Sequence, residues 1–212
     1  MVRAAFHNGM SPLSLTLRLL MLIMCMAGAL PHAARAAPAA AKTDAPQTRI
    51  LYGAKNYPLL SLPGGRQAVV RSVLNITKPM RFGDFVWNED HIPPGPVWVR
   101  VDLAKQLLSV FRAGHEIGSA VILYGDRSKP TPSGNFTVLQ KAADYYSHSY
   151  DAPMPFMLRL TDDGVAIHGS NVRQGWATHG CIGVPMDFAR RLFAAASKGD
   201  RIVIVPAQQG TR

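Results

Sequence analysis

The sequence predicts a mainly β fold, a sandwich or barrel-like pair of packed sheets with one main α-helix near the C-terminus. Three observations lead to this prediction. Val97–Asp102 alternates with a period of two, which is typical of a half-buried strand. Short apolar runs separated by turn residues recur after it, and only one stretch has clear helical periodicity. Many short strands with a single helix indicate two packed layers of sheet.

The expected strands follow one another from residue 97 onwards. Ala113 and Gly114 supply one turn, and a loop containing Pro130, Pro132 and Gly134 supplies another. The strands are expected at Val97–Asp102, 107–111, 117–124, 136–139, 156–160, 164–167 and Arg201–Val205, with weaker candidates at 67–76 and 82–87.

The helix is expected at residues 186–197. Phe188, Leu192 and Phe193 fall on one face at a spacing of 3.6 residues, together with two alanines. Pro185 is suitably placed at its start, and the Lys-Gly-Asp sequence at 198–200 ends it.

The first 36 residues have the order of a secretory signal. Arg3 and Arg18 precede an apolar run at 19–30, and residues 34–36 form an A-x-A cleavage site. Twelve apolar residues are short for a membrane span, so a retained anchor is the weaker interpretation. We therefore expect an exported protein of the periplasm or cell envelope that meets the membrane only through this segment.

The remaining chain divides by composition. We expect a disordered Ala/Pro-rich leader at 37–48, an extension at 49–96 packed on the main domain, the main domain at 97–206 and a short tail at 207–212.

The net charge of +10, from 23 basic and 13 acidic residues, favours polyanionic surroundings or a generally basic surface. The sequence has no lysine or arginine run interleaved with aromatic residues, which argues against a nucleic-acid partner.

The candidate site lies in residues 165–185. Cys181 is the only cysteine left once the signal is removed, so it has no partner for an intramolecular disulfide. A thiol attacks a carbonyl as the thiolate and needs a base or a positive charge nearby. His168, thirteen residues upstream at the end of a strand, is the expected base, and we expect its imidazole to hold the sulfur ionised. His179 lies two residues from Cys181 and can face away from the sulfur.

Two glycines have expected backbone roles. The carbonyl of Gly169 can fix the tautomer of His168. Gly180 lets neighbouring amides turn toward one oxygen and form an oxyanion hole. Two other interpretations remain open. Cys181 can be an inert buried residue, and zinc could bind His168, His179 and Cys181. The sequence has no further ligand at a suitable spacing, so we expect neither metal nor cofactor.

Three segments resemble the L,D-transpeptidase catalytic domain, the YkuD-like family of peptidoglycan enzymes. They are VRVDL with QLLSVF at 99–103 and 106–111, PTPSGNF at 130–136, and IHG with THGCI at 167–169 and 178–182. The resemblance covers about residues 97–206 and implies a sandwich or barrel of two packed mixed sheets. Two features depart from many members, namely Gly183 in place of arginine or asparagine and a shorter loop between His168 and Cys181.

The resemblance also implies a reaction. Cys181 would attack a stem tetrapeptide of peptidoglycan with loss of D-Ala, and an amine of a second stem, a wall-linked lipoprotein or a D-amino acid would accept the acyl group. Thr178, His179 and Gly180 would shape the site. Substrate contacts are expected at Arg173, Tyr146, Met154 and Phe156.

Overall fold

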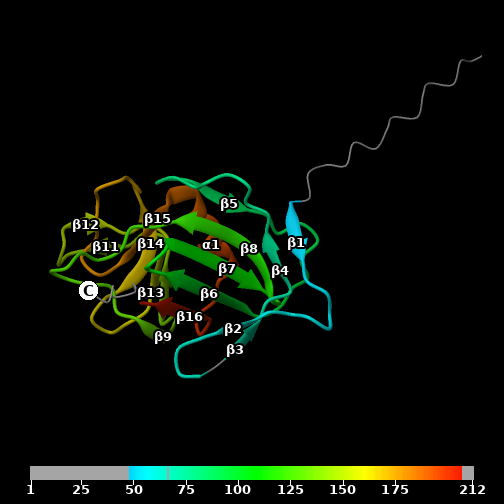
Figure 1. Cartoon of the computed structure of the whole chain (residues 1–212). Coiled ribbons are helices and arrows are strands. Elements are labelled where there is room, and N and C mark those ends of the chain that lie inside the picture. The colour runs from blue at the N-terminus through cyan, green and yellow to red at the C-terminus, as the bar shows by residue number, and fades with distance from the viewer. Residues whose placement is uncertain (1–47, 66, 207–212) are drawn as a thin grey trace, which may run out of the picture. The chain divides into compact units, whose positions relative to one another are not determined.

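The computed structural model describes residues 48–65 and 67–206 (Figure 1). The predictions for residues 1–47 and 207–212 lie outside this part of the chain. The strands are β1 (Arg49–Leu51), β2 (Leu59–Ser61), β3 (Gln67–Val69), β4 (Ser72–Leu74), β5 (Phe85–Trp87), β6 (Val97–Asp102), β7 (Leu107–Arg112), β8 (His115–Val121), β9 (Gly134–Thr137), β10 (Gln140–Ala142), β11 (Tyr146–Ser147), β12 (Ala152–Pro153), β13 (Met157–Arg159), β14 (Ala166–Ser170), β15 (Ile182–Pro185) and β16 (Arg201–Val205). The only helix in the described residues is α1 (Met186–Ala195).

These strands form two main sheets, which confirms the predicted fold class. Within the described residues the larger sheet has eight strands, in the order β1-β4-β8-β7-β6-β16-β9 with β5 on the edge of β8. The smaller sheet has four, in the order β10-β13-β14-β15. Both sheets are mixed, because β16 runs parallel to β6 and β15 runs parallel to β14.

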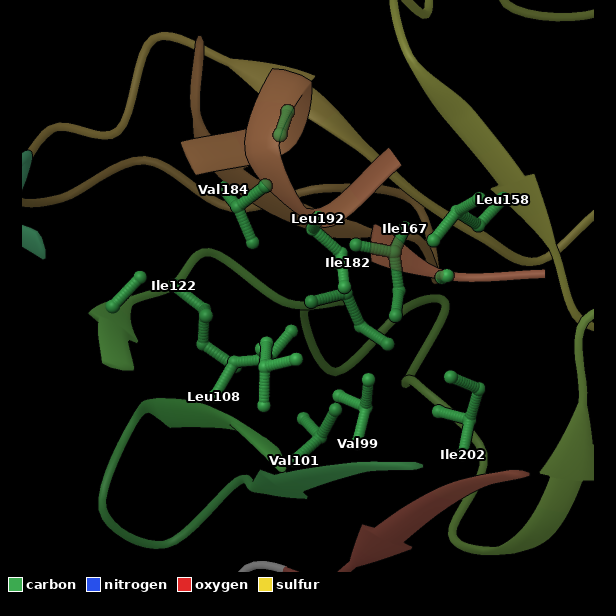
Figure 2. Packing of buried hydrophobic residues seen from close by; sticks show 14 of the residues in the cluster. Val99, Val101, Leu108, Ile122, Leu158, Ile167, Ile182, Val184, Leu192 and Ile202 are labelled. Carbon is green, nitrogen blue, oxygen red and sulfur yellow. The ribbon is translucent and has the colours of Figure 1, made fainter. Parts of the chain in front are cut away.

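The main core lies between the two sheets, as Figure 2 shows. Val99 and Leu108 of the larger sheet face Ile167 and Ile182 of the smaller one, and each of the four is at most 1% exposed. The alternation that predicted a strand at Val97–Asp102 follows from this packing, since every second side chain enters the core.

Helix α1 covers the smaller sheet through one apolar face. Phe188, Ala189 and Leu192 are buried in the main core. The helix ends at Ala195, before the end predicted at residue 197, because Ala196 is already extended. No described helix is long and apolar enough to cross a membrane.

The segment at 49–96 forms more strands than the sequence predicted. The single candidate at 67–76 is two strands, β3 and β4, and β1 and β2 had no clear signal. Leu62, Ala68 and Val70 pack on Trp98 and Val203 in a second cluster, on the face of the larger sheet opposite the main core. This segment is therefore in contact with the larger sheet.

Candidate active site

Cys181 and His168 lie on the same face of the smaller sheet. His168 is opposite Gly183 in the parallel pair β14–β15, and Cys181 is two residues before Gly183. Paired residues of parallel strands point to the same side, and so do residues two apart. Because Ile167 and Ile182 point into the core (Figure 2), His168 and Cys181 are on the outer face.

Cys181 packs against a small group of apolar side chains, which we name the floor of the site. Met154, Met157 and Ala166 are buried beneath it as a small cluster, and the cysteine itself is half-buried. Its Sγ lies 3.7 Å from the carbonyl oxygen of Gly164, in the turn that leads into β14. The sulfur is therefore held at the surface of the sheet, neither enclosed in the main core nor fully in solvent.

The imidazole of His168 is held by a backbone carbonyl. Its Nδ1 is 2.9 Å from the oxygen of Gly169. A carbonyl can only accept, so Nδ1 carries the proton and the neutral ring keeps its lone pair on Nε2. That nitrogen is the one left to take a proton from another group.

Burial acts on both groups in the same direction, toward the neutral form. It raises the pKa of the Cys181 thiol above 9.0, which the Ala166 amide and the charge of Lys129 partly offset. It also lowers the pKa of His168 below 6.5, although the bond to Gly169 opposes this. Both shifts oppose the thiolate–imidazolium pair expected from the sequence. In the mechanism proposed below, the thiol proton therefore moves to His168 during attack.

Two threonine hydroxyls shape the turn before Cys181. Thr178 donates to the carbonyl of Cys181 at 2.5 Å. Thr131, from the PTPSGNF segment, donates to the carbonyl of Gly180 and accepts from the amide of Gly125, each at 2.9 Å. Gly180 has φ +100°, a conformation that side chains rarely adopt.

The turn leaves its amides available. None of the loop hydrogen bonds within the described residues uses the amides of His179, Gly180 or Cys181 as donors. Unused amides beside a thiol are the donors that a developing oxyanion requires.

Three side chains form a cluster next to this turn, which we name the Lys129 cluster: Lys129, Tyr150 and His179. The ammonium of Lys129 donates to the Tyr150 hydroxyl, and the Tyr150 ring stacks on His179 with centroids 5.3 Å apart. His179 is exposed, and the ring that it contacts is that of Tyr150. Sequence reasoning missed Lys129, because a single lysine in a loop carries no signal of its own.

The four expected substrate contacts have different surroundings. Met154 is 6% exposed and belongs to the floor under Cys181. Tyr146 is exposed and donates to Asp151. Phe156 packs against Phe193 of α1 at the edge of the main core. Arg173 is exposed, hydrogen-bonded to Asn171 and placed over the Trp176 ring. Of the four, Met154 belongs to the cluster against which Cys181 packs.

Gly183 is explained by its neighbour in β14. A Cβ at Gly183 would lie 2.9 Å from the Cβ of Ser170. A larger residue here therefore needs Ser170 to move. This contact accounts for the glycine at the position where the resemblance led us to expect arginine or asparagine.

A groove of about 1290 Å³ lies elsewhere, lined by residues of the β2–β3 hairpin, β6, β9 and β16. Neither Cys181 nor His168 lines it. Among the described residues, no three His, Cys, Asp or Glu side chains are grouped as metal ligands would be.

The fold and site together define a two-sheet β protein in which a cysteine and a carbonyl-bound histidine share one sheet face. A cysteine and a histidine are the residue types that serve as nucleophile and base in cysteine-dependent acyl transfer. The profile of the YkuD L,D-transpeptidase catalytic domain matches residues 96–204, just over half of the chain. The chain belongs to the L,D-transpeptidase catalytic domain family.

Solved structures of similar fold include an L,D-transpeptidase from Stackebrandtia nassauensis, with 22% identity and a TM-score of 0.50 over 57% of this chain and 62% of that one. The LD transpeptidase LdtMt1 in complex with imipenem gives 19% identity and a TM-score of 0.50 over 71% of this chain and 100% of that one. The match spans about three fifths of the length of the first such structures. No curated protein matched the sequence.

Proposed function

We propose that this protein is an exported, cysteine-dependent peptidoglycan L,D-transpeptidase. One observation carries the proposal: Cys181 and His168 share one face of the smaller sheet, and the Gly169 carbonyl directs the basic Nε2 of His168 away from the backbone. Family membership supplies the substrate class. Cys181 is then the nucleophile and His168 the general base.

In the first half-reaction the acyl donor is a stem tetrapeptide. His168 takes the thiol proton as Cys181 attacks the carbonyl between the third and fourth residues. A carbon–sulfur bond forms, the carbon–nitrogen bond to D-Ala breaks, and His168 returns the proton to the leaving amine. The product is a thioester on Cys181.

In the second half-reaction an amine attacks the thioester. His168 accepts the proton of this amine, the carbon–sulfur bond breaks, and the thiol is restored with that proton. A side-chain amine of a second stem gives a 3→3 crosslink, whereas a wall-linked lipoprotein or a D-amino acid gives a related amide.

The turn before Cys181 supports this chemistry. The free amides of His179, Gly180 and Cys181 would bind the oxyanion of each tetrahedral intermediate, while Thr178 and Thr131 hold the turn in place. Such preorganised donors contribute about 3 kcal/mol each in enzymes where they have been removed.

The partners follow from the reaction. They are peptidoglycan stem peptides, with a lipoprotein as a second type of acceptor, in the periplasm or cell envelope. The secretory signal is the only part that would meet the membrane.

The test is product analysis with a purified disaccharide-tetrapeptide donor, with and without an acceptor amine. We expect 3→3 linked dimers or amine adducts by mass spectrometry. Accumulation of disaccharide-tripeptide alone, with acceptor present, would identify an L,D-carboxypeptidase or amidase that hydrolyses the same thioester. No product at all would indicate a wall-binding module without catalysis.

A further inference from the structure

We propose that Lys129 is a positioning residue for Cys181: its ammonium, held by Tyr150, supplies the fixed positive charge that stabilises the sulfur as it loses its proton to His168. The inference rests on the proposed function, because it gives Lys129 a part in activating the same nucleophile.

The backbone of Lys129 is fixed next to the turn that presents Cys181. The carboxylate of Asp126 accepts from the amides of Ser128 and Lys129, at 2.8 and 3.1 Å. A Cβ at Gly180 would lie 3.8 Å from the carbonyl oxygen of Lys129, so this loop is in contact with the turn before Cys181. Lys129 therefore has little freedom to move away from the site.

Its side chain runs along the residue that precedes the cysteine. The Cγ of Lys129 is 3.7 Å from where a Cβ of Gly180 would stand. At the far end the ammonium is bonded to the Tyr150 hydroxyl and lies 4.8 Å from the centre of that ring. Tyr150 is in turn stacked on His179. The Lys129 side chain is thus held along its stem and at its ammonium next to the loop that contains Cys181.

The sulfur needs such a charge. The methionine and alanine side chains around it disfavour an anion, and burial also disfavours a positive charge on His168 by lowering its pKa. The titratable groups of the segments around the sulfur are His168 on β14, Asp163 in the turn before β14, and the three members of the Lys129 cluster.

Within this set Lys129 is the one permanent cation and Asp163 opposes it. The charge of Lys129 lowers the pKa of Cys181 and that of Asp163 raises it. None of the ion pairs among the described residues uses Lys129, so no bound carboxylate cancels its charge. Its field remains available to the thiolate.

The test is the rate at which iodoacetamide alkylates Cys181 between pH 6 and 10 in the full chain, followed on the peptide that contains Cys181. This neutral reagent reports the thiolate and requires no peptidoglycan substrate. The variants are Lys129→Met, Lys129→Arg to keep the charge, and Lys198→Met as a matched loss of charge at an exposed position after α1.

We expect Lys129→Met to be about two- to fivefold slower at pH 7, the range typical of a solvent-screened charge pair. Its profile should move to higher pH and reach the wild-type rate where the thiolate is fully formed. Added salt should slow the wild type and leave this variant unchanged. Lys129→Arg and Lys198→Met should follow the wild type.

Superimposed profiles of Lys129→Met and wild type would overturn the inference. So would a rate that is reduced equally at every pH, because that result indicates altered access or folding. Failure of the proposed function is seen separately, as wild-type protein that is alkylated normally but forms no thioester with a stem peptide.

Discussion

Replacing Thr131 by valine tests how the PTPSGNF segment supports the site. The change removes one hydroxyl and keeps the shape of the side chain, which is 7% exposed. Two buried hydrogen bonds are lost, from the Gly125 amide and to the Gly180 carbonyl, both of 2.9 Å. Each bond is worth about 1 kcal/mol, and each buried group left unpaired costs about 1–3 kcal/mol. We expect the free energy of unfolding to fall by about 2–4 kcal/mol, within what a domain of typical stability tolerates.

Urea unfolding measures this loss, and thioester formation measures its effect on the site. With the carbonyl of Gly180 released, the oxyanion amides lose their fixed direction, so acylation should slow by about tenfold or more. Thr137→Val at an exposed position of β9 is the matched control and should change stability by roughly 0.5 kcal/mol at most. A Thr131→Val protein whose free energy of unfolding lies within roughly 0.5 kcal/mol of the wild-type value, and whose rate of acylation is normal, would refute the role assigned to this hydroxyl.

Three further predictions follow from the geometry around β14. Gly183→Ala should lower the free energy of unfolding, because the added methyl meets the Cβ of Ser170. Adding Ser170→Gly should restore the lost stability in a double-mutant cycle of unfolding measurements. Additive effects of the two substitutions would contradict this. Burial lowers the pKa of His168 in the folded protein, so the unfolded chain binds more protons between that lowered pKa and 6.5. The free energy of unfolding should therefore rise with pH across this window. The same rise in a His168→Gln protein would show that it comes from other groups. Arg173→Ala should leave the rate of acylation of Cys181 within about twofold, since Arg173 contacts Asn171 and Trp176 in the free protein. A tenfold loss would contradict this and support the substrate contact expected from the sequence.

The fold was predictable where the side-chain pattern reflects burial on one face. The strands Val97–Asp102 and Arg201–Val205 begin and end at the predicted residues. In the first, valine alternates with other residues, and the second is a continuous apolar run after Arg201. Both patterns reflect packing against a core. Strands β1 and β2 of the segment before residue 96, and the hairpin formed by β11 and β12, were missed. They have two or three residues each, which is too few for a period to be read.

The site was predictable from the sequence only where the pairing of strands determines the positions of its residues. The parallel register of β14 and β15 places Cys181 and His168, thirteen residues apart in the chain, on the same face of the sheet. The carbonyl of Gly169 lies 2.9 Å from the Nδ1 of His168, as the sequence predicted for these neighbours. The Lys129 cluster could not be predicted, since it joins three loops whose approach depends on tertiary packing. The ionisation of the pair could not be predicted for a related reason: it depends on the burial of both groups, which lowers the pKa of His168 and raises that of Cys181.

The proposed mechanism requires that the sulfur of Cys181 accept an acyl group with the help of the His168 imidazole. Intact mass of the purified protein after incubation with disaccharide-tetrapeptide tests this most directly, in wild type, Cys181→Ala and His168→Gln. We expect a wild-type adduct equal to the donor minus D-Ala, no adduct in Cys181→Ala, and formation slower by about two orders of magnitude or more in His168→Gln. An adduct of the same mass on Cys181→Ala, or one formed at the wild-type rate without His168, would contradict it.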